Sequence, residues 1–126
     1  MKHSKIFSII AAGAFLLTAS AAFAEGDVAK GKKIAKKCVA CHSLDEGGKN
    51  RLGPNLFGIL NKKAATNPTY KYSKAMANSG LTWDEATFLE YITKPKKLVK
   101  GTKMSFPGIK KATKRADLLA YFKTLK

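Results

Sequence analysis

The stretch that decides the fold of this chain is Cys38-Val39-Ala40-Cys41-His42, a C-x-x-C-H run. Residues three and four apart lie on one face of a helical turn, so both thiols can reach the two vinyl groups of a single porphyrin. The imidazole that follows can then turn a ring nitrogen toward the porphyrin's iron. C-x-x-C-H is the attachment sequence of c-type haem, and the run therefore predicts two covalent tethers and one axial ligand.

Other uses of these residues fit the chain less well. A dithiol redox pair is expected beside a βαβ pattern, and the sequence shows none. A zinc site needs four ligands, usually Cys or His, but the chain holds two cysteines and few histidines, one of them the N-terminal His3. A disulfide between Cys38 and Cys41 would suit an oxidising compartment, but it leaves His42 without a role.

The first 24 residues predict a cleaved signal peptide, and hence export to the periplasm. Lysines within residues 2–5 precede an apolar run over 6–17, and an A-x-A cleavage site follows at 22–24. We expect a single domain over residues 25–126 to remain. The alternative is an uncleaved membrane anchor, because residues 6–24 are just long enough to span a bilayer. The alanine-rich second half and the cleavage site argue against it.

The charge balance points to acidic partners. The chain has 126 residues with 24 Lys+Arg against 8 Asp+Glu, a net charge of +16 that falls to +14 without Lys2 and Lys5. This length suits one domain. Such a surplus implies a partner with an acidic surface or an anionic membrane, although lysines can also serve solubility alone. Nucleic acid is disfavoured because an exported protein rarely meets it.

Apolar periodicity predicts an all-α fold with three main helices, one shorter helix and long loops. The first helix is expected over 27–38, and Gly31 within it costs about 1 kcal/mol relative to alanine. A glycine there suggests that another element crosses closely. The shorter helix is expected over 73–79, with Gly80 as its stop signal. No stretch alternates with a period of two, so no strand is predicted.

Two more helices are predicted in the second half of the chain. Thr82-x-x-Glu85 matches a capping box that would open one of them, and Pro95 is expected to end it. Residues 100–111 form a basic loop. Thr113 is expected to cap the last helix, whose apolar stripe is Leu118, Leu119, Phe122 and Leu125. Loops this long suggest a chain wrapped around a large cofactor.

Methionine is the favoured second iron ligand. Once residues 1–24 are removed, His42 is the only histidine, and two methionines, Met76 and Met104, remain. A thioether opposite a histidine raises the reduction potential of haem iron. Core packing would explain Met76 in the short helix, whereas Met104 lies in a glycine-framed loop that can bring its side chain over a haem face. Lysine would first have to lose a proton, which is costly near neutral pH.

Further stretches accompany the C-x-x-C-H run in a fixed order. They are Gly26-Asp27-Val28, Gly53-Pro54-Asn55-Leu56, Gly80-Leu81-Thr82-Trp83, Pro95-Lys96-Lys97, Gly101-Thr102-Lys103-Met104 and Asp117-Leu118-Leu119-Ala120-Tyr121. The ordered series resembles class I cytochrome c, most closely its mitochondrial-type and cytochrome c2 group, over nearly the whole of the predicted domain. The resemblance implies that Gly31 meets Tyr121 where the first and last helices cross.

The resemblance also implies the fold and the ligands. The fold would be that of class I cytochrome c, with helices and long loops wrapped around one covalently bound haem c. Cys38 and Cys41 would form the thioethers, and His42 and Met104 would be the axial ligands. The carbonyl of Pro54 would accept a hydrogen bond from His42 and fix the orientation of its ring.

A polar shell around the haem is implied as well. Tyr72 and Trp83 would hydrogen-bond the haem propionates, because buried Tyr and Trp usually need a polar partner. Tyr91 would lie near the sulfur of Met104, and Thr102 would support the Met104 loop. The plain alternatives are core packing for the tryptophan and a buried ring with a wet hydroxyl for the tyrosines.

Four positions depart from the family's pattern. Lys62 stands where an arginine usually approaches a propionate, and it lacks the bidentate fork. Met76 replaces a common asparagine of the polar network and would displace water. Ala35 replaces a bulky aromatic, so the crossing of the first and last helices would be looser or packed by Phe122. Asn50 stands where a loop histidine is common.

The function implied is a soluble periplasmic one-electron carrier and not an enzyme, since two protein ligands leave the iron no open position for a substrate. The donor would be a quinol–cytochrome c oxidoreductase. The acceptor would be a terminal oxidase of a respiratory chain or a photosynthetic reaction centre. A monomer is expected. The alternative is a haem enzyme or a gas sensor, either of which would need a labile Met104.

Docking on the acidic surfaces of these membrane complexes is expected to use lysines around an exposed haem edge. The lysines that match such family positions are Lys33, Lys37, Lys49, Lys96, Lys97, Lys103, Lys110 and Lys111. Any one of them could be an ordinary solvated lysine, but as a set they form a docking face. Encounters of this kind are weak and fast.

Overall fold

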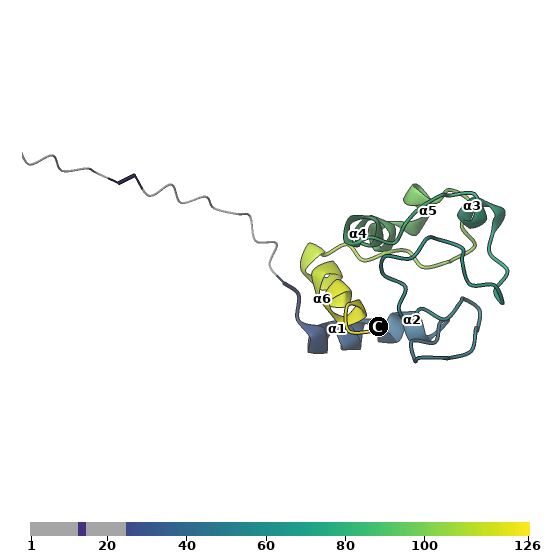
Figure 1. Cartoon of the computed structure of the whole chain (residues 1–126), viewed down its shortest axis with the longest axis horizontal. Coiled ribbons are helices and arrows are strands. Elements are labelled where there is room, and N and C mark those ends of the chain that lie inside the picture. Colours follow the sequence, from purple (N-terminus) through teal and green to yellow (C-terminus); the bar gives the residue numbers. More distant parts are fainter. Residues whose placement is uncertain (1–12, 15–24) are drawn as a thin grey trace, which may run out of the picture.

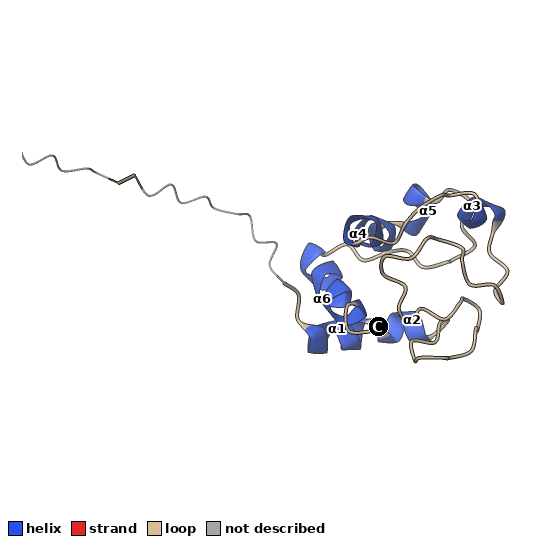
Figure 2. Cartoon of the chain, viewed as in Figure 1, coloured by secondary structure: helices blue, strands red, loops and turns tan. Residues whose placement is uncertain are grey.

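The computed structural model describes residues 13, 14 and 25–126, and within them it consists of helices and long loops (Figure 2). The helices are α1 (Val28–Ile34), α2 (Lys36–Val39), α3 (Lys74–Ala77), α4 (Glu85–Thr93), α5 (Pro95–Leu98) and α6 (Ala112–Phe122). In the described part of the chain the only β pairing is an isolated bridge between Lys63 and Thr82. The all-α class expected from the sequence is confirmed.

The described domain begins just before its first helix. Asp27 is the N-cap of α1, and its carboxylate accepts a hydrogen bond from the N–H of Lys30 at 2.9 Å. The expected signal peptide lies almost wholly outside the described residues, so the boundary at residue 25 stays a prediction. None of the described helices is long and apolar enough to cross a membrane.

Helices α1 and α6, from opposite ends of the domain, cross in direct contact (Figure 1). The contact is close because Gly31 has no side chain. A Cβ at that position would lie 2.8 Å from the Cβ of Tyr121 and 2.7 Å from the carbonyl carbon of Asp117. The side-chain carboxylate of Asp117 also accepts a hydrogen bond from the N–H of Asp27 at 2.8 Å. The glycine therefore marks the predicted crossing.

The first predicted helix, over 27–38, is in fact two helices that meet at Ala35. The N–H of Cys38 donates to the carbonyl of Ala35, three residues back, at 2.9 Å, and this tightens the turn where α2 begins. Ala35 is 1% exposed and shares one hydrophobic cluster with Phe122, which is 3% exposed. Of the two expectations for this small residue, packing by Phe122 is confirmed.

Two helix starts differ from the predictions. The capping box at Thr82 is wrong, because α4 is capped by Asp84, whose carboxylate accepts from the N–H of Thr87 at 2.8 Å. The Thr82 backbone instead forms the bridge to Lys63. Pro95 follows the end of α4 as expected, but it also starts the unexpected helix α5, where proline suits the first turn.

The cap predicted at Thr113 is also wrong. The N-cap of α6 is Lys111, two residues earlier than predicted, and it makes no side-chain cap. The guanidinium of Arg115 donates to the carbonyls of Ile109 at 2.8 Å and Lys110 at 2.7 Å, so a longer side chain organises this entry. The predicted short helix is present as α3, capped by the Ser73 hydroxyl. The predicted loop over 100–111 is confirmed, since it contains no helix.

Candidate functional site

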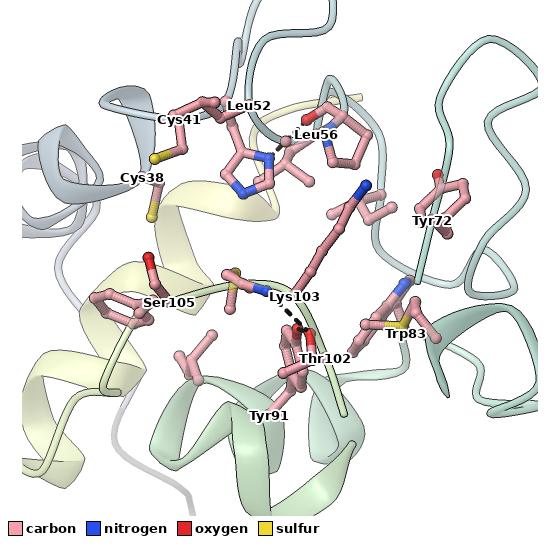
Figure 3. Close-up of a pocket in the computed structure, with 18 of the residues that line it drawn as sticks. Cys38, Cys41, Leu52, Leu56, Tyr72, Trp83, Tyr91, Thr102, Lys103 and Ser105 are labelled. Atoms are coloured by element: carbon pink, nitrogen blue, oxygen red, sulfur yellow. Dashed lines mark hydrogen bonds between the residues drawn. The ribbon is translucent and has the colours of Figure 1, made fainter. Parts of the chain in front are cut away.

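The helices and loops line an open cavity of about 700 Å³. Its volume lies within the range of about 300–1,000 Å³ that is usual for ligand sites. All nine residues that the sequence assigned to cofactor binding line it, namely Cys38, Cys41, His42, Pro54, Tyr72, Trp83, Tyr91, Thr102 and Met104. The structure thus brings together side chains that lie up to 66 positions apart in the sequence. Figure 3 shows how the labelled members of this set surround one space.

The two cysteines lie on and just after α2, with their sulfur atoms pointing into the cavity (Figure 3). The N–H of Cys41 donates to the carbonyl of Cys38 at 3.0 Å, so the helical turn between them is closed. Both are free thiols. Burial, and to a lesser degree the nearby Cys41, raises the pKa of the Cys38 thiol to about 11, so this thiol is protonated at neutral pH.

The ring of His42 is 9% exposed and held in one orientation. Its Nδ1 lies 2.7 Å from the carbonyl oxygen of Pro54. A carbonyl can only accept, so Nδ1 carries the proton and Nε2 keeps a free lone pair. Burial lowers the pKa of His42 in spite of the Pro54 bond, which favours this neutral form. Gly53 packs on the ring, because a Cβ there would lie 2.6 Å from Nδ1.

The opposite wall positions Met104. The hydroxyl groups of Tyr91 and Thr102 lie 3.1 Å apart in a hydrogen bond, drawn as a dashed line in Figure 3. Thr102 Oγ1 also accepts from the N–H of Met104 at 3.4 Å. Burial raises the pKa of Tyr91, so its phenol stays protonated. Thr102 is thus hydrogen-bonded both to Tyr91 and to the backbone of Met104.

Trp83 and Tyr72 form a third side of the cavity (Figure 3). Trp83 is 7% exposed, and its ring centroid lies 4.9 Å from that of Tyr91. Trp83 lines the cavity. Within the described residues no group accepts a hydrogen bond from its indole nitrogen. The Tyr72 hydroxyl accepts from the N–H of Asn67 at 3.1 Å and is free to donate. Both groups can serve an acceptor inside the cavity.

The departures from the family's pattern fall in different places. Met76 is 8% exposed and lines the cavity, with the Ser79 hydroxyl 4.0 Å from its sulfur. Lys62 is exposed and does not line the cavity. Asn50 joins two loops, since its Oδ1 accepts from the N–H of Asn55 at 3.1 Å and from Asn67 Nδ2 at 3.0 Å.

Sequence reasoning missed the apolar wall of the site. Phe88, Ile92, Leu118 and Phe122 belong to the hydrophobic core, but they also line the cavity. The sequence identified the apolar stripe of α6 only as a helix face. A helix stripe looks the same in sequence whether it faces side chains or a cofactor, so no signal could have separated the two roles.

The chemistry of the lining fits a covalently bound haem. Two thiols, an imidazole with a free Nε2 lone pair and a thioether share one cavity whose remaining lining is mostly apolar. The free indole N–H is the kind of donor that a propionate would use. In the described part of the chain no three His, Cys, Asp or Glu side chains gather as a metal-binding cluster, so the alternative zinc site has no ligand set.

The eight lysines predicted to dock are all exposed, and Lys37 and Lys103 among them line the cavity. Among the described residues the one ion pair joins Lys123 and Glu85 at 2.7 Å. The predicted docking lysines therefore carry charge that no neighbouring carboxylate neutralises.

The comparisons with known proteins agree on one family. The family model described as cytochrome c matches residues 28–126. Cytochrome c2 from Rhodoblastus acidophilus is 50% identical over 101 residues, 80% of this chain and 94% of the relative. Cytochrome c2 from Rhodomicrobium vannielii is 42% identical over 120 residues, 95% of this chain and 96% of the relative. The solved structure of cytochrome cH from Methylobacterium extorquens matches with a TM-score of 0.73 and 44% identity, covering 79% of this chain and 99% of that chain.

Proposed function

Since this chain belongs to the cytochrome c family, whose members carry electrons rather than act as enzymes, we propose that it is a periplasmic one-electron carrier. Its haem c would be bound through Cys38 and Cys41 and ligated by His42 and Met104. The observation that carries the proposal is the single cavity that all four residues line. When bound, the haem supplies a centre that gains and loses one electron.

The chain's own part is to hold and shield that centre. Pro54 keeps the proton of His42 on Nδ1, so Nε2 retains the lone pair that would ligate the iron. Thr102 holds the backbone of Met104. Apolar side chains such as Phe88 exclude water from the walls. A dry, preorganised site reorganises little when its charge changes, which is what fast electron transfer needs.

The partners we propose are membrane redox complexes with acidic docking surfaces. A quinol–cytochrome c oxidoreductase would be the donor, and a terminal oxidase or a photosynthetic reaction centre the acceptor. The support is the net charge of +16 and the exposed, unpaired lysines of the docking face. Export fits the signal-like residues 1–24, which would deliver the domain to the compartment where these complexes exchange electrons.

The optical spectrum of the purified exported protein tests the proposal. We expect low-spin spectra in both redox states and, in the oxidised form, the weak near-infrared band of a sulfur–iron bond. Met104→Ala should abolish this band. Met76→Ala is the matched control, because it also removes a methionine that lines the cavity, and it should keep the band.

Two outcomes would contradict the ligand assignment. A high-spin or five-coordinate spectrum of the native protein would favour a haem enzyme or a gas sensor, and peroxidase and gas-binding assays would then follow. Loss of the band in Met76→Ala but not in Met104→Ala would exchange the roles of the two methionines.

A further inference from the structure

One large apolar side chain at the rim of the cavity lies in water. Leu52 is 80% exposed, compared with 45% for Val28 and 39% for Val39, the other exposed large hydrophobic residues in the described part of the chain. Leu52 also lines the cavity and lies beside Cys41 in Figure 3. Single exposed hydrophobic residues are common and need no special explanation, so the surroundings of Leu52 decide its meaning.

The backbone that carries Leu52 is fixed on both sides. Its carbonyl accepts a hydrogen bond from the Tyr70 hydroxyl at 2.7 Å. The N–H of Gly53 donates to the carbonyl of Cys41 at 2.8 Å, and the N–H of Arg51 donates to the carbonyl of Gly53 at 2.9 Å. These hydrogen bonds hold the backbone of the turn in a conformation that leaves the leucine exposed. The side chain is therefore preorganised for a contact, which lowers the entropy lost on binding.

Three cations accompany this leucine or the cavity that it lines. Arg51 precedes it in the chain, and Lys37 lines the same cavity. The ammonium of Lys103 lies 4.5 Å from the ring centroid of Tyr70, the residue whose hydroxyl holds the Leu52 carbonyl. In the described part of the chain none of these three cations is in an ion pair. An exposed leucine accompanied by cations outside any ion pair complements an apolar depression flanked by carboxylates.

We propose that Leu52 is the apolar anchor of the electron-transfer contact. It enters an apolar depression on the partner protein, while the cations around it face carboxylates at the rim. The inference rests on the proposed function and assigns separate roles to the charges and to the leucine. The charges set the rate of encounter, and the leucine stabilises the complex in one register near the cysteine side of the cavity.

A protein partner fits Leu52 better than a lipid surface does. Helices that bind membranes present a broad apolar face, whereas Leu52 is the one exposed large hydrophobic residue of the described chain that lines the cavity, since Val28 and Val39 do not. The centre of a protein interface needs only one or two well-placed side chains to supply much of the binding energy.

The test is the second-order rate constant for oxidation of the reduced protein by a purified bacterial cytochrome c oxidase, measured against ionic strength. Leu52→Ala should lower it about tenfold at every ionic strength, equivalent to about 1.4 kcal/mol. The slope against ionic strength should not change. Val28→Ala is the matched control, because Val28 is exposed but does not line the cavity, and it should leave the rate constant unchanged.

Further measurements keep the inference separable from the proposed function. Reduction by ascorbate and the midpoint potential should be the same in Leu52→Ala and the wild type. Equal oxidase rates in the two proteins would overturn the anchor while leaving the carrier function intact. An equal loss with oxidase and ascorbate would overturn it too, by assigning Leu52 to the haem pocket. If Leu52→Ala binds phosphatidylglycerol vesicles more weakly and the oxidase rate is unchanged, the protein anchor is overturned and Leu52 is a membrane contact. A wild-type protein that the oxidase cannot oxidise would remove both proposals.

Discussion

The orientation of His42 depends on Gly53, the residue that packs against its ring. A Cβ at Gly53 would lie 2.6 Å from Nδ1 and 2.8 Å from Nε2 of His42. Gly53→Ala should therefore displace the ring and destabilise the haem-loaded protein by about 1–3 kcal/mol, as overpacking does. Chemical denaturation measures this change, and the haem spectrum should shift with it.

The matched control for Gly53 is Gly80, which has a φ of +64° and no neighbouring atom within 4 Å of the place that a Cβ would take. Gly80→Ala should cost only the left-handed backbone term, about 1–2 kcal/mol, and leave the haem spectrum unchanged. An unaltered spectrum in Gly53→Ala would mean that the ring tolerates the added methyl group, and the role given to this glycine would fail.

At the scale of helices, the crossing of α1 and α6 depends on Gly31. Alanine there should gain about 1 kcal/mol of helix propensity, but its Cβ would lie 2.7 Å from the carbonyl carbon of Asp117. The helices would have to separate, so we expect a net loss of about 1–3 kcal/mol in guanidinium denaturation. Lys32→Gly, on the exposed face of α1, measures helix propensity without the crossing, and it should lower the free energy of unfolding by about 1 kcal/mol. A more stable Gly31→Ala protein would show that the crossing can relax.

The start of α4 gives a pH-dependent prediction. Hydrogen bonds from Thr87, chiefly from its backbone N–H, lower the pKa of the Asp84 carboxyl. A lowered folded-state pKa stabilises the protein above the unfolded-state pKa, and this stabilisation is lost as the pH falls through the folded-state value. Asp84→Ala should therefore lower the Tm at neutral pH, and the difference from wild type should shrink in acid. Thr82→Ala should leave the Tm unchanged. A fall in Tm larger in Thr82→Ala than in Asp84→Ala would mean that Thr82 caps the helix after all.

These helix starts show what the sequence could and could not predict. Periodic apolar residues identified the helix around Leu118 because burial of a stripe outweighs local detail. The predicted first residues of α4 and α6 were wrong because more than one nearby residue can serve as the N-cap of each helix. Tertiary contacts determine which residue does. The bridge from Lys63 engages the Thr82 backbone, and Arg115 organises the entry to α6. The candidate site residues could be named from the sequence, and they line one cavity, because side chains specialised for one chemistry occur few times in this chain.

On the scale of the whole molecule, unpaired positive charge should control the rate of partner encounter. The rate constant with cytochrome c oxidase should fall at least tenfold between low and physiological salt, since steering of this kind is screened by ions. Lys37→Gln, at the cavity rim, should make the fall less steep. Lys123→Gln is the control, because Lys123 is already paired with Glu85. A wild-type rate that does not respond to salt would count against the docking face.

The cavity is also the missing part of the core. Phe88, Ile92, Leu118 and Phe122 face it from α4 and α6, so these helices pack fully only around an occupant. Without an occupant these apolar side chains would face water, which costs about 25 cal/mol per Å² of apolar surface. A domain of this size has a total stability of about 5–15 kcal/mol.

The chain without its haem should therefore lack a cooperative fold. The Cys38→Ala/Cys41→Ala double variant removes both tethers, and after extraction of any loosely held haem it should show weak helical circular dichroism and no cooperative heat-absorption peak. Cys38→Ser/Cys41→Ser is the matched variant, which separates the loss of the thioethers from the loss of side-chain volume. Added haem should restore helix in both, because the walls and His42 remain. A cooperative thermal transition in the haem-free chain would mean that the helices collapse on one another, and that the cavity is not what holds them apart.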